Sequence, residues 1–231
     1  MPPLSRFFPR FSTGPVKETL MYELYAFATP NSVKVTIALE ELGLPYTLHG
    51  INIRQGEQGG ASFIALNPNG KVPVLIDRDA GGEKLLLTES AAILVHLAEK
   101  TGRLLPTDAP ARARVFEQLF FHASALSPAF GQAGFFRRFA SETLPLAIER
   151  FDNEARRVLG VLDGVLAHRD FVAGNAFSIA DIAHFGWLWR RSFPGIALDR
   201  TPHVARWYEQ IAARPGVQRG IDRVEALTAR N

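Results

Sequence analysis

Cysteine is absent from this chain of 231 residues. Without cysteine the protein can have no structural disulfide, no thiolate metal site and no thiol nucleophile of its own. Any thiol chemistry would therefore use a sulfur that a ligand brings. The absence also permits a reducing compartment, and we expect the protein to be cytoplasmic.

Lysine is absent from residues 106–231, which carry sixteen Arg and thirteen acidic residues, and the net charge of the whole chain is only +3. These Arg alternate with acids at helical spacing instead of forming a basic stripe, which indicates solvated helix faces and argues against nucleic-acid binding. Long apolar runs are also missing, and none approaches the roughly twenty residues needed to cross a bilayer. We therefore expect no nucleic acid and no membrane among its partners.

The first twenty residues, MPPLSRFFPRFSTGPVKETL, contain three prolines before position 10 and no periodic pattern. Such a segment predicts a flexible extended arm over residues 1–20. Two other interpretations stay open: a leader resembling a transit peptide, and a chain that starts at Met21.

Residues 21–104 alternate between strands and helices. We predict a strand over residues 22–27, a helix from Asn31 or Ser32 to Leu42 with its apolar residues on one face, and a parallel strand over 45–53. A glycine-rich loop follows, then two strands within NPNGKVPVLID and KLLLT, and a helix in TESAAILVHLAEKTG. This βαβ–ββα order is the thioredoxin arrangement.

The character of the chain changes after a proline-containing linker near residues 105–111. Apolar residues then recur at helical spacing, and we predict helices at about 111–127, 141–168, 178–191 and 201–213. The fold class is therefore α/β plus all-α, with an all-α domain over residues 111–231.

Other polar residues of the chain predict structure more readily than metal chemistry. Ser178 and Asp181 have the spacing of a helix N-terminal cap. The six His are scattered without ligand spacing, and His96, His122 and His184 fall in helical runs, so we expect no metal.

The junction Thr29-Pro30-Asn31 lies where the first strand meets the first helix. A bound thiol placed there would meet a hydroxyl, an amide and free backbone N–H groups, all of which favour the thiolate. One charge-assisted hydrogen bond would lower a thiol pKa by roughly one to two units, so no protein base is needed. The alternative is that the junction only caps the helix.

Two further stretches have features of a ligand site. A cis bond between Val72 and Pro73 would turn the backbone of Val72 toward an extended peptide, although an ordinary edge-strand proline would look the same in sequence. Glu89 and Ser90 open a helix, where a carboxylate and an ammonium can both be held. The alternative there is a capping box led by Thr88.

The combination of TPNSVKVTIALEELGLPY, NPNGKVPVL, TESAAILVHLAEKTG, AIERF and NAFSIADIA resembles the cytosolic glutathione transferases over about residues 21–220. The Thr-Pro-Asn junction most resembles the bacterial nu-class members that reduce disulfide bonds. The resemblance implies an N-terminal thioredoxin-like glutathione-binding domain, a helical C-terminal domain, a homodimer, and glutathione as the co-substrate of an enzyme.

The resemblance also implies roles for single residues. Thr29 and Asn31 would face the glutathione sulfur as the catalytic pair. The glutathione-binding residues that it implies are Gln58 in the GEQ loop, Lys71, Val72 and Pro73 along the peptide backbone, Glu89 and Ser90 at the γ-glutamyl group, and Arg150, which would reach the ligand's carboxylates from the helical domain.

The acceptor side departs from the relatives' pattern, because Gly131-Gln132 is followed by Ala133-Gly134-Phe135-Phe136 where Asn or His often stands. This puts a second bound glutathione in doubt. Seven Phe fall within residues 116–139, and they would either line a pocket for an apolar co-substrate or belong to the core or a dimer interface.

We therefore expect an enzyme that stabilises the glutathione thiolate for reduction of a small disulfide or for transfer to an apolar electrophile. The alternatives are conventional conjugation, peroxidase activity, or a scaffold that binds glutathione without turnover.

Overall fold

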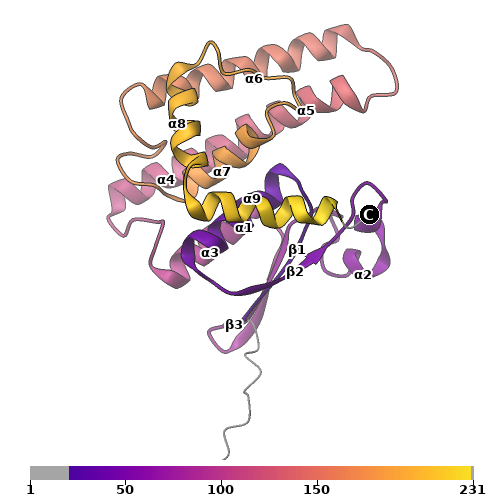
Figure 1. Ribbon diagram of the computed structural model, residues 1–231, viewed down its shortest axis with the longest axis vertical. Helices are drawn as coiled ribbons and strands as arrows, with labels where there is room; N and C mark the ends of the chain where they lie inside the picture. The colour runs from indigo at the N-terminus through magenta and orange to yellow at the C-terminus, as the bar shows by residue number, and fades with distance from the viewer. Residues whose placement is uncertain (1–20, 230–231) are drawn as a thin grey trace, which may run out of the picture.

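The computed structural model describes residues 21–229, so the predicted N-terminal arm over residues 1–20 lies outside the described part. Figure 1 shows two halves, one built around a sheet and the other made of helices. The change from strands to helices falls between α3 (Ser90–Thr101) and α4 (Ala109–Phe121). Within residues 21–229 no helix is long and apolar enough to span a membrane.

The sheet has the strand order β2-β1-β3-β4. Strand β1 (Tyr22–Ala26) pairs in parallel with β2 (Tyr46–Gly50) and antiparallel with β3 (Val74–Ala80), which pairs antiparallel with β4 (Glu83–Leu87). The predicted parallel return and the thioredoxin arrangement are therefore confirmed. Between β2 and β3 lie a short 3-10 turn (Glu57–Gly59) and α2 (Ala61–Ile64).

Helix α1 (Pro30–Leu42) begins one residue before the predicted start, because Pro30 occupies its first turn and Thr29 is the N-cap. Gly43, with φ 70°, ends it in the left-handed conformation. The prediction of a single buried face was wrong, since residues 32–39 are all buried. Helices α7 (Ile179–Trp189) and α9 (Pro215–Glu225) pack on α1 and cover the side that would otherwise meet water.

The helical half contains elements that the sequence did not predict. The expected helix at 111–127 is instead α4 followed by a π-helical segment, His122–Leu126. Helices α5 (Ser127–Arg138) and α9 were not predicted, because each has a proline in its first turn and contains two glycines, which weaken a helical pattern. The remaining helices are α6 (Pro145–Leu166) and α8 (Pro202–Ala212).

Helix α9 lies beside α1 across the middle of the molecule (Figure 1). Gly220 allows this approach, because a Cβ at Gly220 would lie 2.7 Å from the backbone of Ile37. Thr36 donates a hydrogen bond of 2.7 Å to the carbonyl oxygen of Gly220, and Arg214 forms a two-pronged ion pair with Glu41. The first helix of the sheet half is therefore also a core helix of the whole molecule.

The predicted cap at Ser178 is confirmed as a capping box at the start of α7. Asp181 is fully buried and accepts hydrogen bonds from the backbone of Val172 and Ser178 and from the indole of Trp207. This network fixes α7 against α8, and α7 in turn carries residues of the site.

Candidate functional site

Three stretches predicted to contact a ligand meet in one cavity of about 240 Å³, which we call the Asn31 cavity. It lies between the first turn of α1, the segment before β3 and the first turn of α3. The residues that line it are Asn31, Asn69, Lys71, Val72, Pro73, Thr88, Glu89 and Ser90.

The Val72–Pro73 peptide bond is cis, as the sequence predicted. Strand β3 begins only at Val74, and neither the N–H nor the C=O of Val72 has a hydrogen-bond partner among residues 21–229. Lys71 is held in place because its carbonyl oxygen accepts a 2.7 Å hydrogen bond from the Asn67 amide. The backbone of Val72 is thus free to pair with an extended peptide.

Helix α3 begins at Ser90, with Glu89 as its N-cap residue in extended conformation. No side chain caps this helix, so the alternative of a capping box led by Thr88 is wrong. The uncapped N–H groups of the first turn are therefore available to an anion, beside the exposed Glu89 carboxylate that suits an ammonium.

The Thr29 side chain caps α1, which is the alternative that the sequence left open. Its hydroxyl oxygen accepts the Ser32 N–H at 3.1 Å, and its O–H donates to the Ser32 hydroxyl oxygen at 3.0 Å. A thiolate could receive this proton only if the hydroxyl turned away from Ser32.

The Asn31 amide is held by a buried lysine. Its oxygen accepts a 2.7 Å hydrogen bond from the Nζ of Lys34, which also lies 2.8 Å from Nε2 of His122. Lys34 is only 2% exposed, and burial lowers the pKa of its ammonium to about 7. Sequence analysis assigned no role to Lys34, because nothing local to α1 indicates that helices from the second half cover it.

A second cavity, which we call the Arg190 cavity, lies on the other side of the same turn and has a volume of about 410 Å³. Thr29 lines it, so the Thr29–Asn31 turn separates the two cavities. The residues lining it are Ala28, Thr29, Pro30, Ile53, Arg54, Arg138, Phe139, Trp187, Arg190, Ser192 and Phe193.

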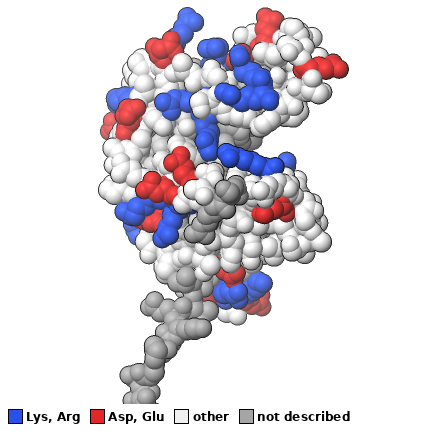
Figure 2. Space-filling view, turned by 45° about the vertical axis from the view of Figure 1, so that its right-hand side comes forward, with Lys and Arg blue, Asp and Glu red and all other residues white. Residues whose placement is uncertain are grey.

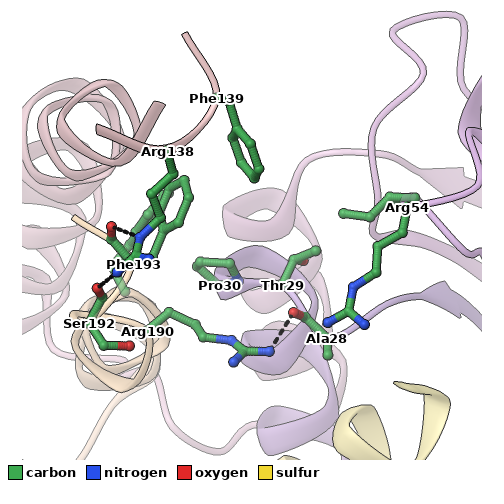
Figure 3. Close-up of a pocket in the computed structure, with 11 residues that line it drawn as sticks. Ala28, Thr29, Pro30, Arg54, Arg138, Phe139, Arg190, Ser192 and Phe193 are labelled. Atoms are coloured by element: carbon green, nitrogen blue, oxygen red, sulfur yellow. Dashed lines mark hydrogen bonds between the residues drawn. The ribbon is translucent and has the colours of Figure 1, made fainter. Parts of the chain in front are cut away.

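Arginines give the Arg190 cavity a positive wall (Figure 3). Arg190 donates to the Ala28 carbonyl at 3.0 Å, and Arg138 donates to the carbonyls of Ser192 and Phe193. Burial lowers the pKa of the Arg190 guanidinium. None of the described residues lining this cavity is acidic, and Figure 2 shows Lys and Arg side chains at the hollow between the two halves.

The predicted role of the phenylalanines is confirmed in part. Of the seven within residues 116–139, all of which the structure describes, only Phe139 lines the Arg190 cavity, where its ring contacts that of Phe193. Phe130 is buried in the core, and Phe120 is 70% exposed on the outer surface. The missed residues Phe193 and Arg190 follow α7 in a segment with no recognisable motif.

Two predicted ligand residues lie outside both cavities. Gln58 belongs to the 3-10 turn before α2, and a Cβ at Gly70 would lie 3.4 Å from its carbonyl oxygen, so it neighbours the segment that leads to Lys71. Arg150 lies on α6 and lines a separate shallow hollow with Glu149 and Glu154. In residues 21–229 no group of His, Asp and Glu is arranged to hold a metal ion.

The chain matches two family models: the glutathione S-transferase N-terminal domain over residues 28–100 and the glutathione S-transferase C-terminal domain over residues 126–215. It is also 38% identical over 205 residues to the disulfide-bond oxidoreductase YfcG of Escherichia coli strain K12, covering 87% of this chain and 94% of that protein. The chain belongs to the glutathione S-transferase family. The resemblance predicted from its motifs is therefore confirmed.

Solved structures of this glutathione S-transferase family share the fold. A member from Pseudomonas fluorescens with two glutathione bound is 39% identical, has a TM-score of 0.83, and is matched over 90% of this chain and 95% of that one. A glutathione transferase from Pseudomonas putida with one glutathione disulfide bound per subunit is 38% identical, with a TM-score of 0.84 and coverage of 90% and 93%.

Proposed function

We propose that this glutathione S-transferase family member binds glutathione in the Asn31 cavity and uses its thiolate to reduce small disulfides. One observation carries the proposal: the Thr29–Asn31 turn stands between a cavity suited to a tripeptide and a cavity suited to a second substrate. The free backbone of Val72 and the first turn of α3 would hold the tripeptide. The sulfur would then lie at the boundary between the cavities.

The chemistry needs no residue of the protein to change its redox state. The glutathione thiolate attacks one sulfur of the disulfide, so a new S–S bond forms, the old one breaks, and the other half leaves as a thiolate that takes up a proton. A second glutathione thiolate then displaces the remaining half. Overall, one disulfide is reduced to two thiols while two glutathiones are oxidised to glutathione disulfide.

The Arg190 cavity would take the second substrate. Its Arg54, Arg138 and Arg190 favour a disulfide that carries carboxylates, because the described lining residues include no acid to repel it. The relatives from Pseudomonas hold two glutathiones or one glutathione disulfide. These observations favour a second glutathione half in this cavity, although the sequence put that in doubt.

We also propose a homodimer. Large apolar side chains are exposed on α5, α6 and the loop between them, including Leu144 at 44% and Leu146 at 81%, which is unusual for a surface in contact with water. Arg150 lies on this helical side and lines neither cavity, so it could reach a ligand carboxylate only across such an interface. Light scattering of the wild type and of Leu146→Glu tests the dimer, and a monomeric wild type would contradict it.

The function is tested by glutathione-dependent reduction of a small disulfide. We expect the wild type to turn over and Asn31→Ala to lose at least about tenfold in rate near pH 7, since a thiol pKa higher by one unit makes the thiolate about tenfold scarcer. Isothermal calorimetry with glutathione is run in parallel. Equal rates for the wild type and Asn31→Ala would show that Asn31 does not act in the reaction and would contradict the proposed site.

A second candidate is conjugation of glutathione to an apolar electrophile, which the aromatic wall of Phe139, Trp187 and Phe193 favours. Assays with aryl halides and peroxides beside the disulfide rank these activities. Turnover of none of them, together with measurable glutathione binding, would indicate a scaffold protein instead.

A further inference from the structure

Lys34 is the largest charged side chain among the fully buried residues of the described chain. It lies in α1, three residues after Asn31, where α7 passes so close that a Cβ at Gly186 would be 2.8 Å from Cγ of Lys34. A buried ammonium without partners is costly, so its contacts indicate what holds it. Its hydrogen bonds go to the Asn31 amide oxygen and to His122.

The hydrogen-bond roles around Lys34 can be assigned from the donors. While Lys34 is protonated it only donates, so Nε2 of His122 accepts and the proton of that imidazole sits on Nδ1. His184 stands edge-on to His122 and donates from Nε2 to the Gln118 carbonyl. Burial keeps the pKa of both imidazoles below the ordinary value, to about 3 for His184, so both rings are neutral.

The same logic fixes the Asn31 amide. Because its oxygen accepts from an ammonium, its NH₂ group must be the end that is not turned toward Lys34. Among residues 21–229 the Asn31 side chain has one hydrogen bond, which goes to its oxygen, and Asn31 lines the cavity proposed for glutathione. The amide is therefore oriented in advance as a donor.

We propose that Lys34 is a positioning residue: held between Asn31 and His122, its ammonium orients and polarises the Asn31 amide so that the NH₂ group donates to the glutathione thiolate. This inference rests on the proposed function. The polarisation strengthens the amide as a donor, and the buried positive charge adds a field that favours an anionic sulfur. His122 supplies the second acceptor for the ammonium.

The titratable groups around Lys34 come from three neighbouring elements. His122 faces it from the π-helical segment, His184 from α7, and Glu89 from the start of α3. Glu89 raises the pKa of Lys34, whereas burial lowers it to about 7. Thiolate stabilisation through Asn31 should therefore weaken as pH rises through the pKa of Lys34.

The test is a pH titration of the ultraviolet thiolate absorbance of glutathione bound to wild type, Lys34→Met, His122→Gln and His122→Leu. Lys34→Met keeps the side-chain length without the charge, and Lys84→Met on the exposed part of β4 is its matched control. We expect Lys34→Met to raise the pKa of the bound thiol by about one unit and to cut the rate at pH 6.5 about tenfold. Lys84→Met should change neither.

His122→Gln retains an acceptor for Lys34 and should titrate like the wild type, whereas His122→Leu should shift the thiol pKa in the same direction as Lys34→Met. If Lys34→Met does not fold, the comparison of these two variants decides. The inference is overturned if Lys34→Met folds and its bound thiol titrates like that of the wild type. If Lys34→Met does not fold, the same result with His122→Leu overturns it. Either result would leave the proposed function intact. A wild type that binds no glutathione would instead overturn the proposed function.

Discussion

Gly186 in α7 lies against the Pro30 carbonyl oxygen, and a Cβ added to Gly186 would be only 2.4 Å from that oxygen. The contact joins the second half of the chain to the first turn of α1, the turn that separates the two cavities. A larger residue at position 186 would push the helices apart at the site.

Gly186→Ala should lower the free energy of unfolding by about 1–3 kcal/mol, because the methyl group overpacks a closed contact. Gly164→Ala is the control, since a Cβ at Gly164 in α6 meets no atom within 4 Å and should raise stability by up to about 1 kcal/mol. Urea unfolding of the two variants checks the opposite signs. Equal changes in the free energy of unfolding of the two variants would show that the close approach of α7 to α1 does not affect stability.

Thr29→Ala should lower the free energy of unfolding by about 1 kcal/mol, because the Ser32 N–H loses its acceptor at the start of α1. Thr29→Ser retains the hydroxyl and should keep both stability and activity. Thermal melts and disulfide-reduction rates separate the two roles of the hydroxyl. A Thr29→Ala protein that melts lower but turns over at the wild-type rate would reduce Thr29 to a helix cap.

Asn31→Asp should separate stability from chemistry. The carboxylate would pair with the Lys34 ammonium and lie at the positive end of α1, so we expect unchanged or higher stability, by roughly 1 kcal/mol. The same negative charge would repel a thiolate, and the pKa of bound glutathione should rise. Melting curves and thiolate absorbance measure the two effects on one sample, and a variant that still holds the thiolate would contradict the role of the amide donor.

His184 should make the protein sensitive to acid. Its pKa is about 3 in the folded state and near 6.5 when unfolded, so between these values the unfolded chain holds a proton that the folded chain lacks. The free energy of unfolding therefore falls by about 1.4 kcal/mol for each unit that the pH drops within this window.

Between pH 6 and pH 4.5, His184→Gln should accordingly lose about 2 kcal/mol less than the wild type in urea unfolding. His168→Gln, at an exposed position, is the matched control and should follow the wild type. Parallel pH profiles for wild type and His184→Gln would show that His184 is not buried in its neutral form.

Local signals made the Asn31 cavity predictable. A proline before a strand, a helix opened by Glu89 and Ser90, and a Thr-Pro-Asn junction each determine backbone geometry over a few residues, and the thioredoxin arrangement brings them together. The strands of the sheet were predictable for the same reason, since turn residues separate them.

Contacts between distant parts of the chain were not predictable. Lys34 and His122 are separated by 88 positions, and Arg190 and Ala28 are separated by 162. No sequence pattern near any of these residues indicates its partner. Helix α9 was missed because its two glycines, which make close packing on α1 possible, also weaken its helical pattern. The residues that join the two halves are thus the ones that sequence patterns identify least well.

The packing of α9 on α1 also bears on synthesis at the ribosome. Thr36 and Gly220 are 184 positions apart. Because synthesis adds about 5–20 residues per second, α9 is made roughly 10 to 40 seconds after α1, the helix that it covers. During that interval an apolar side of α1 meets water and other nascent chains. Messages truncated before residue 215 should therefore yield aggregated product, even though they encode every residue that lines the two cavities.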